Sequence, residues 1–250
     1  MPRTKAVSRT RSSKQIKNSS APLLPDAFVS RVSKILVPLG DPALRPWMQA
    51  YMKDQFEFLG VKTPVRRALT RQLIGMQRGA TAAELLRSAR MLWALPQREY
   101  QYVAIDLLGK HVRALGPKHL PALFRLAQQK SWWDTVDALA AGVIGAIVRS
   151  ARTEDPKIQC EMDKALQSSN LWLRRVAILH QLGWREQTDS ERLFEYALAC
   201  AHEKEFFIRK VIGWALRDYA RHDPKAVGAF LRLNRDKLSP LTLREAAKHL

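Results

Sequence analysis

Apolar residues recur every three to four positions along most of the chain, which is the spacing of one face of an α-helix. No run alternates apolar and polar residues between Asn-Gly or Asp-Gly turns, so strands are not expected. Prolines stand near the starts of several of the apolar segments, where a helix tolerates them. The pattern predicts an all-α protein with helices over 43–58, 64–77, 96–114, 118–128, 132–149, 170–183, 190–201, 204–222 and 240–249. The expected N-cap residues are Ser131, Asn170 and Asp189.

One kind of helix returns at intervals of 33 to 39 residues. Its copies read YQYVAIDLL from Tyr100, WDTVDALAA from Trp133, WLRRVAILH from Trp172, FIRKVIGWA from Phe207 and LTLREAAKH from Leu241. A further helix fits between each pair of copies. Helix pairs of this length cannot bury their apolar faces alone, so neighbouring pairs must stack. The repeat predicts an α-solenoid of the HEAT or armadillo kind, curved around a concave groove.

The net charge of the chain indicates the kind of partner that it binds. The chain holds 42 Lys and Arg against 23 Asp and Glu, a net charge of +19. Such an excess indicates a polyanion, either a nucleic acid or an anionic membrane surface. No apolar run approaches the roughly 18 residues of a spanning helix, so a nucleic acid is favoured.

The N-terminal segment differs from the rest. Its first 22 residues contain six Lys and Arg and no acid, and removing those six charges leaves +13 on the remainder. We expect residues 1–25 to form a disordered basic arm and residues 26–250 to form one domain. Two cysteines in separate segments indicate a reducing compartment, and no histidine lies at metal-ligand spacing with them, so neither a metal nor a cofactor is expected.

Aligning the repeats indicates candidate functional positions. Three residues after the leading aromatic or leucine, the last three copies carry Arg175, Lys210 and Arg244, so stacking would line these cations along one surface. One position further on, Asp137 replaces residues that are apolar in three other copies. Trp133 lies four residues before Asp137 and shares its helix face. Asp137 is either a carboxylate paired with a neighbouring arginine or a functional acid beside an indole.

Several segments together resemble a known family. They are YMKDQFEFLGVKTPVRR, LPQREYQYVAIDLL, KSWWDTVD, NLWLRRVAIL, EFFIRKVIGWALRDYA and the ending LSPLTLREAAKHL. These segments, spread over about 45–250, resemble the HEAT-like-repeat alkylpurine DNA glycosylases, the bacterial DNA alkylation repair family of AlkD type. The resemblance implies hydrolysis of the N-glycosidic bond of N3- and N7-alkylated purines, such as 3-methyladenine and 7-methylguanine, during base excision repair of duplex DNA.

The resemblance also implies roles for individual residues. The essential carboxylate falls on Asp137 and the two catalytic aromatics on Trp133 and Trp214, while Arg175, Arg217 and Tyr51 match groove residues that hold DNA. Lys62 stands where an uncharged polar residue is expected, and it would either strengthen a phosphate contact or alter lesion preference. Lys210 and Arg244 would contact phosphates, as their shared position in the repeats indicates. We expect a monomer in the bacterial cytoplasm, associated with the nucleoid through DNA binding.

Two alternatives stay open. A non-catalytic HEAT-type module that binds a nucleic acid or a protein would explain the repeats and the charge. A lyase-type glycosylase would use Lys210 as a Schiff-base nucleophile. Trp47, Trp132 and Trp172 are expected in the core. Adjacent Trp132 and Trp133 point about 100° apart on a helix, so only one of them can face the groove with Asp137. Asp134 is expected to be a helix-start acid that favours the dipole.

Overall fold

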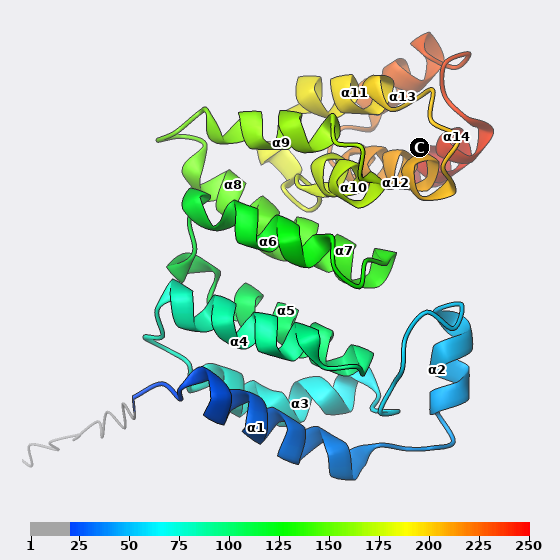
Figure 1. Cartoon of the computed structure of the whole chain (residues 1–250). Helices are drawn as coiled ribbons and strands as arrows, with labels where there is room; N and C mark the ends of the chain where they lie inside the picture. Colours follow the sequence, from blue (N-terminus) through cyan, green and yellow to red (C-terminus); the bar gives the residue numbers. More distant parts are fainter. Residues whose placement is uncertain (1–20) are drawn as a thin grey trace, which may run out of the picture.

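The computed structural model describes residues 21–250, and this part of the chain is helical with no strand (Figure 1). The basic arm expected over 1–25 lies almost wholly outside the described residues. The α-helices are α1 Pro25–Leu36, α2 Arg45–Tyr51, α3 Thr63–Gly75, α4 Ala82–Ala94, α5 Arg98–Lys110, α6 Leu120–Ala127, α7 Trp133–Leu139, α8 Gly145–Ala151, α9 Ile158–Leu166, α10 Leu171–Leu179, α11 Ser190–Ala199, α12 Phe206–Ala220, α13 Pro224–Leu233 and α14 Pro240–Ala246. Short 3₁₀ turns cover Val37–Leu39, Val112–Ala114, Pro117–His119, Arg185–Gln187 and Ala247–His249, and a π turn covers Ala140–Ile144.

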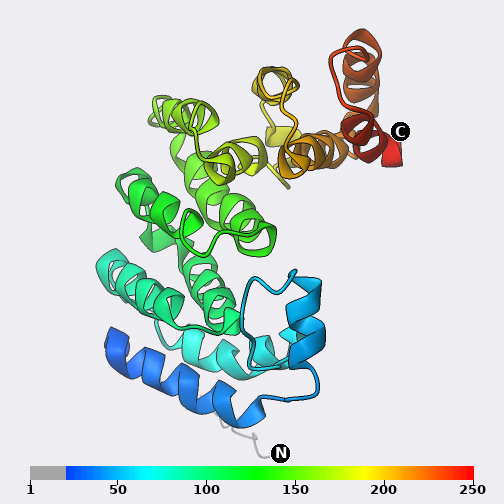
Figure 2. The ribbon, with the colours of Figure 1, turned by 45° about the vertical axis from the view of Figure 1, so that its right-hand side comes forward.

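The repeating segments form one row of stacked helices. α5 packs on α7, α7 on α10, α10 on α12 and α12 on α14, and each of these helices carries one copy of the sequence repeat. Helices α4, α6, α9, α11 and α13 pack against members of this row as a second layer. The stack curves along its length, and α2 stands within the opening of the curve (Figure 2). The predicted α-solenoid is therefore confirmed.

The core of the array is continuous because each repeat buries its apolar face against the next. The positions three and four residues into the copies hold Val103, Val136, Val176 and Val211, all fully buried. They belong to one apolar cluster that runs from Phe28 to Ala246. Removing such side chains from water is the main force that holds the stack together.

Two of the three predicted N-caps are confirmed. The side chain of Asn170 accepts from the backbone N–H groups of Trp172 and Leu173, and that of Asp189 accepts from Arg192 N–H. The prediction for Ser131 is wrong, since its hydroxyl donates to the carbonyl of Ala127 at 2.8 Å. Trp132 stands at the N-cap of α7 instead, in an extended conformation with φ −159°.

The helix predicted over 43–58 is much shorter in the structure. α2 ends at Tyr51, and Lys53 and Asp54 follow with φ of 56° and 57°. Such left-handed residues terminate a helix, which explains the early stop. Helices α1, α4, α9 and α13 lie outside the predicted ranges, although each buries residues at helical spacing, such as Phe28, Val32 and Leu36 in α1.

The helix predicted over 132–149 is present, with one irregularity. A π turn joins α7 to α8 after Leu139. At its end, a Cβ on Gly145 would lie 2.0 Å from the carbonyl oxygen of His180, so only glycine allows this part of the chain to approach α10 so closely. π turns within α-helices occur frequently beside functional sites.

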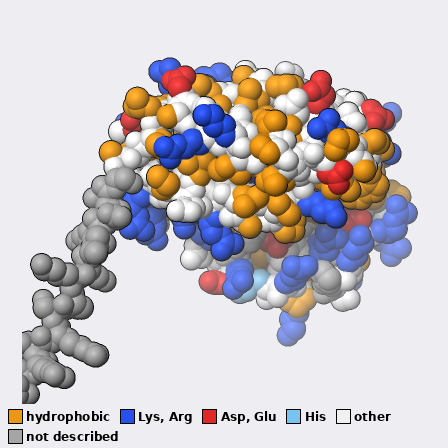
Figure 3. All heavy atoms as spheres, turned by 90° about the horizontal axis from the view of Figure 1, so that it is seen from below, with side chains coloured by type: hydrophobic (Ala, Val, Ile, Leu, Met, Phe, Trp, Pro, Cys, Tyr) orange, Lys and Arg blue, Asp and Glu red, His pale blue; other side chains and the backbone are white. Residues whose placement is uncertain are grey.

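The surface of the described chain is basic. On the face shown in Figure 3, Lys and Arg side chains outnumber Asp and Glu, and apolar side chains also reach the surface. Exposed residues of α1 and α3 include Arg31, Arg67 and Arg71. This distribution agrees with the net charge of the sequence.

Candidate functional site

Helix α7 separates its two leading tryptophans. The ring of Trp132 packs against Trp172 and Phe207, with centroid distances of 5.9 and 5.1 Å. The ring of Trp133 instead lines two surface cavities. The prediction that only one of these tryptophans faces the groove is therefore confirmed. Trp172 is partly buried and packs against the apolar core, as predicted, whereas Trp132 is partly buried without belonging to that core.

Asp137 is held by Arg175 through two hydrogen bonds. Nε of Arg175 donates to Oδ1 at 2.6 Å, and Nη2 donates to Oδ2 at 2.7 Å. The third nitrogen, Nη1, donates to the backbone carbonyl of Phe207 at 2.6 Å. One guanidinium therefore joins α7, α10 and α12, which belong to three successive repeats. Three of the five N–H groups of Arg175 are used in this way, and two of them fix the carboxylate of Asp137.

The pair lies mostly out of solvent. The side chain of Asp137 is 13% exposed and that of Arg175 is 4% exposed. Burial raises the pKa of Asp137 above the usual value of 3.8, and the negative charge of Asp134 acts in the same direction. The hydrogen bonds and positive charge of Arg175 oppose this rise without cancelling it. Asp137 is thus a desolvated carboxylate whose orientation is fixed at both oxygens.

Aromatic rings surround the cavity beside this pair. The cavity measures about 260 Å³ and is lined by Tyr51, Trp133, Arg175, Phe206, Phe207, Lys210 and Trp214. Tyr51 meets Trp133 edge to face with centroids 6.0 Å apart, and Nζ of Lys210 lies 5.5 Å from the centre of the Phe206 ring. The structure thus brings together Tyr51, Trp133, Arg175, Lys210 and Trp214, all predicted site residues.

Sequence reasoning gave no role to Phe206 and Phe207. Phe207 could have been found, because it occupies the same repeat position as Trp133. Phe206 carries no such signal, since nothing in the repeat alignment marks the position before the leading aromatic.

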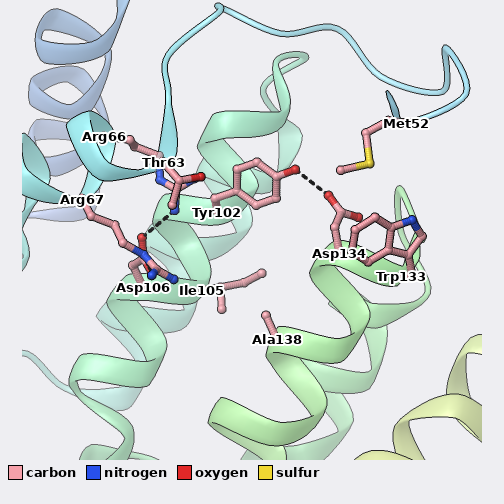
Figure 4. Close-up of a pocket in the computed structure, with 10 residues that line it drawn as sticks. All are labelled: Met52, Thr63, Arg66, Arg67, Tyr102, Ile105, Asp106, Trp133, Asp134 and Ala138. Atoms are coloured by element: carbon pink, nitrogen blue, oxygen red, sulfur yellow. Dashed lines mark hydrogen bonds and ion pairs between the residues drawn. The ribbon is translucent and has the colours of Figure 1, made fainter. Parts of the chain in front are cut away.

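Trp133 also lines a second cavity (Figure 4). It measures about 290 Å³ and is lined by Met52, Thr63, Arg66, Arg67, Tyr102, Ile105, Asp106, Trp133, Asp134 and Ala138. Arg66 and Arg67 share the carboxylate of Asp106, at 3.1 and 3.4 Å. Burial lowers the pKa of Arg66, while Asp106 acts in the opposite direction. No role for Arg66, Arg67 or Asp106 was predicted from the sequence.

A second arginine fixes the start of α7. Arg98 is fully buried and donates to both oxygens of Asp134, from Nε at 3.0 Å and from Nη2 at 2.6 Å. Its Nη1 donates to the carbonyl of Lys130 at 2.7 Å, and Tyr102 donates its hydroxyl to Asp134 at 2.6 Å. Asp134 lies in the first turn of α7, as predicted, and it also anchors that turn to α5.

The remaining predicted residues lie in different environments. Arg217 pairs with Glu245 at 2.8 Å and lies 5.6 Å from the centre of the Trp214 ring. Lys62, the N-cap residue of α3, and Arg244, in the last turn of α14, are exposed. The core prediction for Trp47 is wrong, because its side chain is 67% exposed and stacks on Tyr51.

Among residues 21–250, no three His, Cys, Asp or Glu side chains gather in a way that could hold a metal ion. None of the helices in that range combines the length and the apolar character needed to cross a lipid bilayer.

A curved stack of basic helix pairs, with a carboxylate–guanidinium pair beside an aromatic cavity, defines a repeat protein suited to an extended anionic partner. The family model described as DNA alkylation repair enzyme matches residues 32–250, so the chain belongs to that family. Among solved structures, a predicted DNA alkylation repair enzyme from Enterococcus faecalis is 35% identical, with a TM-score of 0.77; the match covers 84% of this chain and 96% of that one. No curated protein matches. The chain therefore has a role in DNA repair, with DNA as its substrate.

Proposed function

We propose that this protein is a monofunctional DNA glycosylase that hydrolyses the N-glycosidic bond of cationic N3- and N7-alkylpurines in duplex DNA. The observation that carries the proposal is the Asp137 carboxylate, held at both oxygens by Arg175 beside the cavity that Trp133 and Trp214 line. Membership of the DNA alkylation repair family supports it. The sequence resemblance to the AlkD-type glycosylases points to the same reaction.

The substrate explains why a carboxylate suffices. An alkylated purine already carries a positive charge, so no strong acid is needed to protonate the leaving group. When the C1′–N bond breaks, its electron pair neutralises the base, and positive charge develops on the deoxyribose. The Asp137 carboxylate stabilises that charge before water forms the new C1′–O bond. Asp137 or solvent then takes the proton of the water.

Arg175 keeps this carboxylate in a single orientation. A free aspartate would lose rotamer freedom at the transition state, whereas the pair with Arg175 fixes both oxygens beforehand. The guanidinium also offsets part of the negative charge, which lowers the cost of burying Asp137. We assign Arg175 as a positioning residue.

The aromatic walls suit a cationic lesion. Trp133 and Trp214 line the cavity, and a cation over the face of an aromatic ring gains about 0.5–2 kcal/mol. A neutral purine gains less from the same surface and leaves more slowly. Selectivity would therefore depend on the charge of the lesion as well as on its shape.

Three cations would hold the DNA backbone: the exposed Lys62 and Arg244 and the half-buried Lys210. Lys62 lies at the start of α3, directly before Thr63 of the second cavity, while Lys210 and Arg244 lie on α12 and α14. Contacts of this kind fix register on the duplex without reading sequence. Arg217 forms an ion pair with Glu245 and would hold the ring of Trp214 in place. We further propose action as a monomer on nucleoid DNA in a bacterial cytoplasm.

The decisive test is release of free base from duplex DNA that carries a single 7-methylguanine. With protein in excess, the wild-type chain should release the base well above the spontaneous rate, and Asp137→Asn should approach that background. Absence of release by the wild-type chain, with damaged DNA still bound, would favour the non-catalytic module. Borohydride trapping should yield no covalent complex; a complex that disappears in Lys210→Ala would establish the lyase alternative.

A further inference from the structure

Helix α2 differs from every other helix around the groove, because none of its residues is buried. It stands within the opening of the solenoid rather than in either layer (Figure 2). Two of its side chains are large and aromatic, and both are mostly exposed: Trp47 at 67% and Tyr51 at 59%. An exposed indole gives up the stabilisation that burial of its apolar surface would provide, so its exposure calls for a functional reason.

The rings of Trp47 and Tyr51 are nearly parallel and stacked. Trp47 and Tyr51 lie one helical turn apart on the same face of α2, with centroids 5.9 Å apart and ring planes inclined by only 13°. Tyr51 also contacts the edge of Trp133 and lines the cavity beside Asp137. The aromatic surface therefore runs from Trp133 through Tyr51 to Trp47, outward from the candidate catalytic centre.

The base of α2 is held firmly although the helix itself is not packed. Glu99 accepts the backbone N–H groups of Leu59, Gly60 and Val61, at 2.9, 2.9 and 3.1 Å. Arg45 donates to the carbonyl of Leu59 at 3.0 Å. A Cβ on Gly60, where φ is +92°, would lie 2.2 Å from the carbonyl oxygen of Asp41, so the segments before and after α2 touch. This support presents the two rings in a fixed place, which lowers the entropy cost of binding.

We propose that Trp47 and Tyr51 form a stacking site for a nucleobase that has left the duplex at the lesion. Nucleobases are planar π systems that stack on exposed aromatic side chains regardless of sequence, and the chain belongs to a DNA repair family. The inference rests on the proposed function, since it supplies the binding surface that an unstacked base needs while the sugar lies near Asp137. Trp47 is a specificity-determining residue in this scheme and touches no reacting bond.

The base could be the damaged purine or its former partner, and three duplexes of one sequence distinguish them. The first is fully paired. The second carries the stable analogue 3-deaza-3-methyladenine opposite a tetrahydrofuran abasic analogue, so only the lesion base lacks a partner. The third carries tetrahydrofuran at the lesion position opposite thymine, so only the partner base is orphaned. Affinities of the full chain are measured for all three at one salt concentration.

Trp47→Ala should weaken binding to at least one duplex with an orphan base by about tenfold, the range for loss of one stacked base, and change the paired duplex less than twofold. The duplex that shows the loss identifies the base. Trp47→Phe should restore most of the affinity, and Trp47→Leu, which is apolar but has no π face, should not. Leu233→Ala, which truncates a side chain 83% exposed on α13, should alter none of the three.

Equal loss on all three duplexes, or no loss on any, would overturn the stacking site. Melting temperatures should match the wild type, because Trp47 is exposed and contributes little to the core. Base release from 7-methylguanine is measured separately. A chain that binds orphan bases through Trp47 but releases no base would refute the hydrolysis while leaving the stacking site in place.

Discussion

Arg175 and Asp137 face each other across two repeats with both carboxylate oxygens engaged, at 2.6 and 2.7 Å. The sequence left two roles open for Asp137, an ion pair with an arginine or a functional acid, and these roles turn out to be compatible. A carboxylate that is desolvated and oriented before the substrate arrives is what stabilisation of a developing cation requires. The charge, the orientation and the burial of Asp137 should each affect the rate of base release in a different way.

Asp137→Asn should lower the single-turnover rate of base release by about 10²–10³, because it removes the charge that faces the sugar cation. Duplex affinity should stay the same or rise slightly, since the DNA phosphates repel the carboxylate in the ground state. The amide keeps only one acceptor for Arg175, so the melting temperature should also fall. Rate and affinity are measured on the same 7-methylguanine duplex. A wild-type rate in this variant would exclude Asp137 from the mechanism.

The rate of base release should fall as the solution is made acid. The fall should begin at a higher pH than it would for an aspartate with an ordinary pKa. Burial raises the pKa of Asp137, and the carboxylate, not the acid, is the active form. The rate should therefore be constant while the group is ionised and fall as pH drops through this raised pKa. Single-turnover rates from neutral to mildly acid pH, corrected for spontaneous depurination, test the shift. Asp137→Asn provides the control and should show no such decline.

Arg175→Lys should separate orientation from charge. Lysine keeps the positive charge but cannot donate to both carboxylate oxygens in one plane and also reach the carbonyl of Phe207. We expect the rate of base release to fall about 10- to 100-fold through misplacement of Asp137, with a smaller change in duplex affinity. Comparable losses of affinity for damaged and undamaged duplex, with the rate at saturation preserved, would assign Arg175 to phosphate binding instead.

Arg244→Ala should weaken binding to damaged and undamaged duplex alike, because phosphate contacts carry no sequence or lesion information. The slope of log affinity against log salt should become shallower by about 0.9 if one phosphate contact is lost. Titrations at several salt concentrations measure this slope. An effect restricted to damaged DNA would place Arg244 at the lesion rather than on the backbone.

Stability should fall as pH drops from 6.5 towards 4 through His180. Complete burial lowers the pKa of this histidine from 6.5 to about 4, although its bond to the carbonyl of Ala177 opposes the shift. In this interval the unfolded chain takes up a proton that the folded chain does not, so protonation favours unfolding. Denaturant midpoints at neutral and mildly acid pH should differ less in His180→Gln than in the wild type. An unchanged difference would mean that other groups cause the acid sensitivity.

The parts of the molecule that the sequence predicts well are those that repeat. Trp133, Trp172 and Phe207 lie in the first turn of equivalent helices, and the buried positions after them recur with each copy. The row of stacked helices therefore follows from spacing alone. Asp137 is recognisable because it interrupts this pattern. The exposed α2 is harder to predict, because it buries no residue and its end depends on the left-handed Lys53 and Asp54.

Contacts between distant residues are the other part that the sequence does not reveal. Arg98 meets Asp134 and Arg66 meets Asp106 across gaps of 36 and 40 residues, and neither pair carries a motif. Arg175 looks like a phosphate ligand from its register with Lys210 and Arg244. Its burial and its commitment to Asp137 become visible only once α7, α10 and α12 are placed side by side.

The guanidinium that joins three repeats also limits how this protein can evolve. Solenoids commonly gain or lose whole repeats by duplication and deletion, because each unit contacts only its neighbours. Here Asp137, Arg175 and Phe207 come from three consecutive units. Removing or inserting a unit among them would separate Asp137 from Arg175, or Arg175 from the carbonyl of Phe207. Growth is open only at the ends of the array. Lineages should accordingly vary in their first and last helices and keep an unbroken run from α7 to α12.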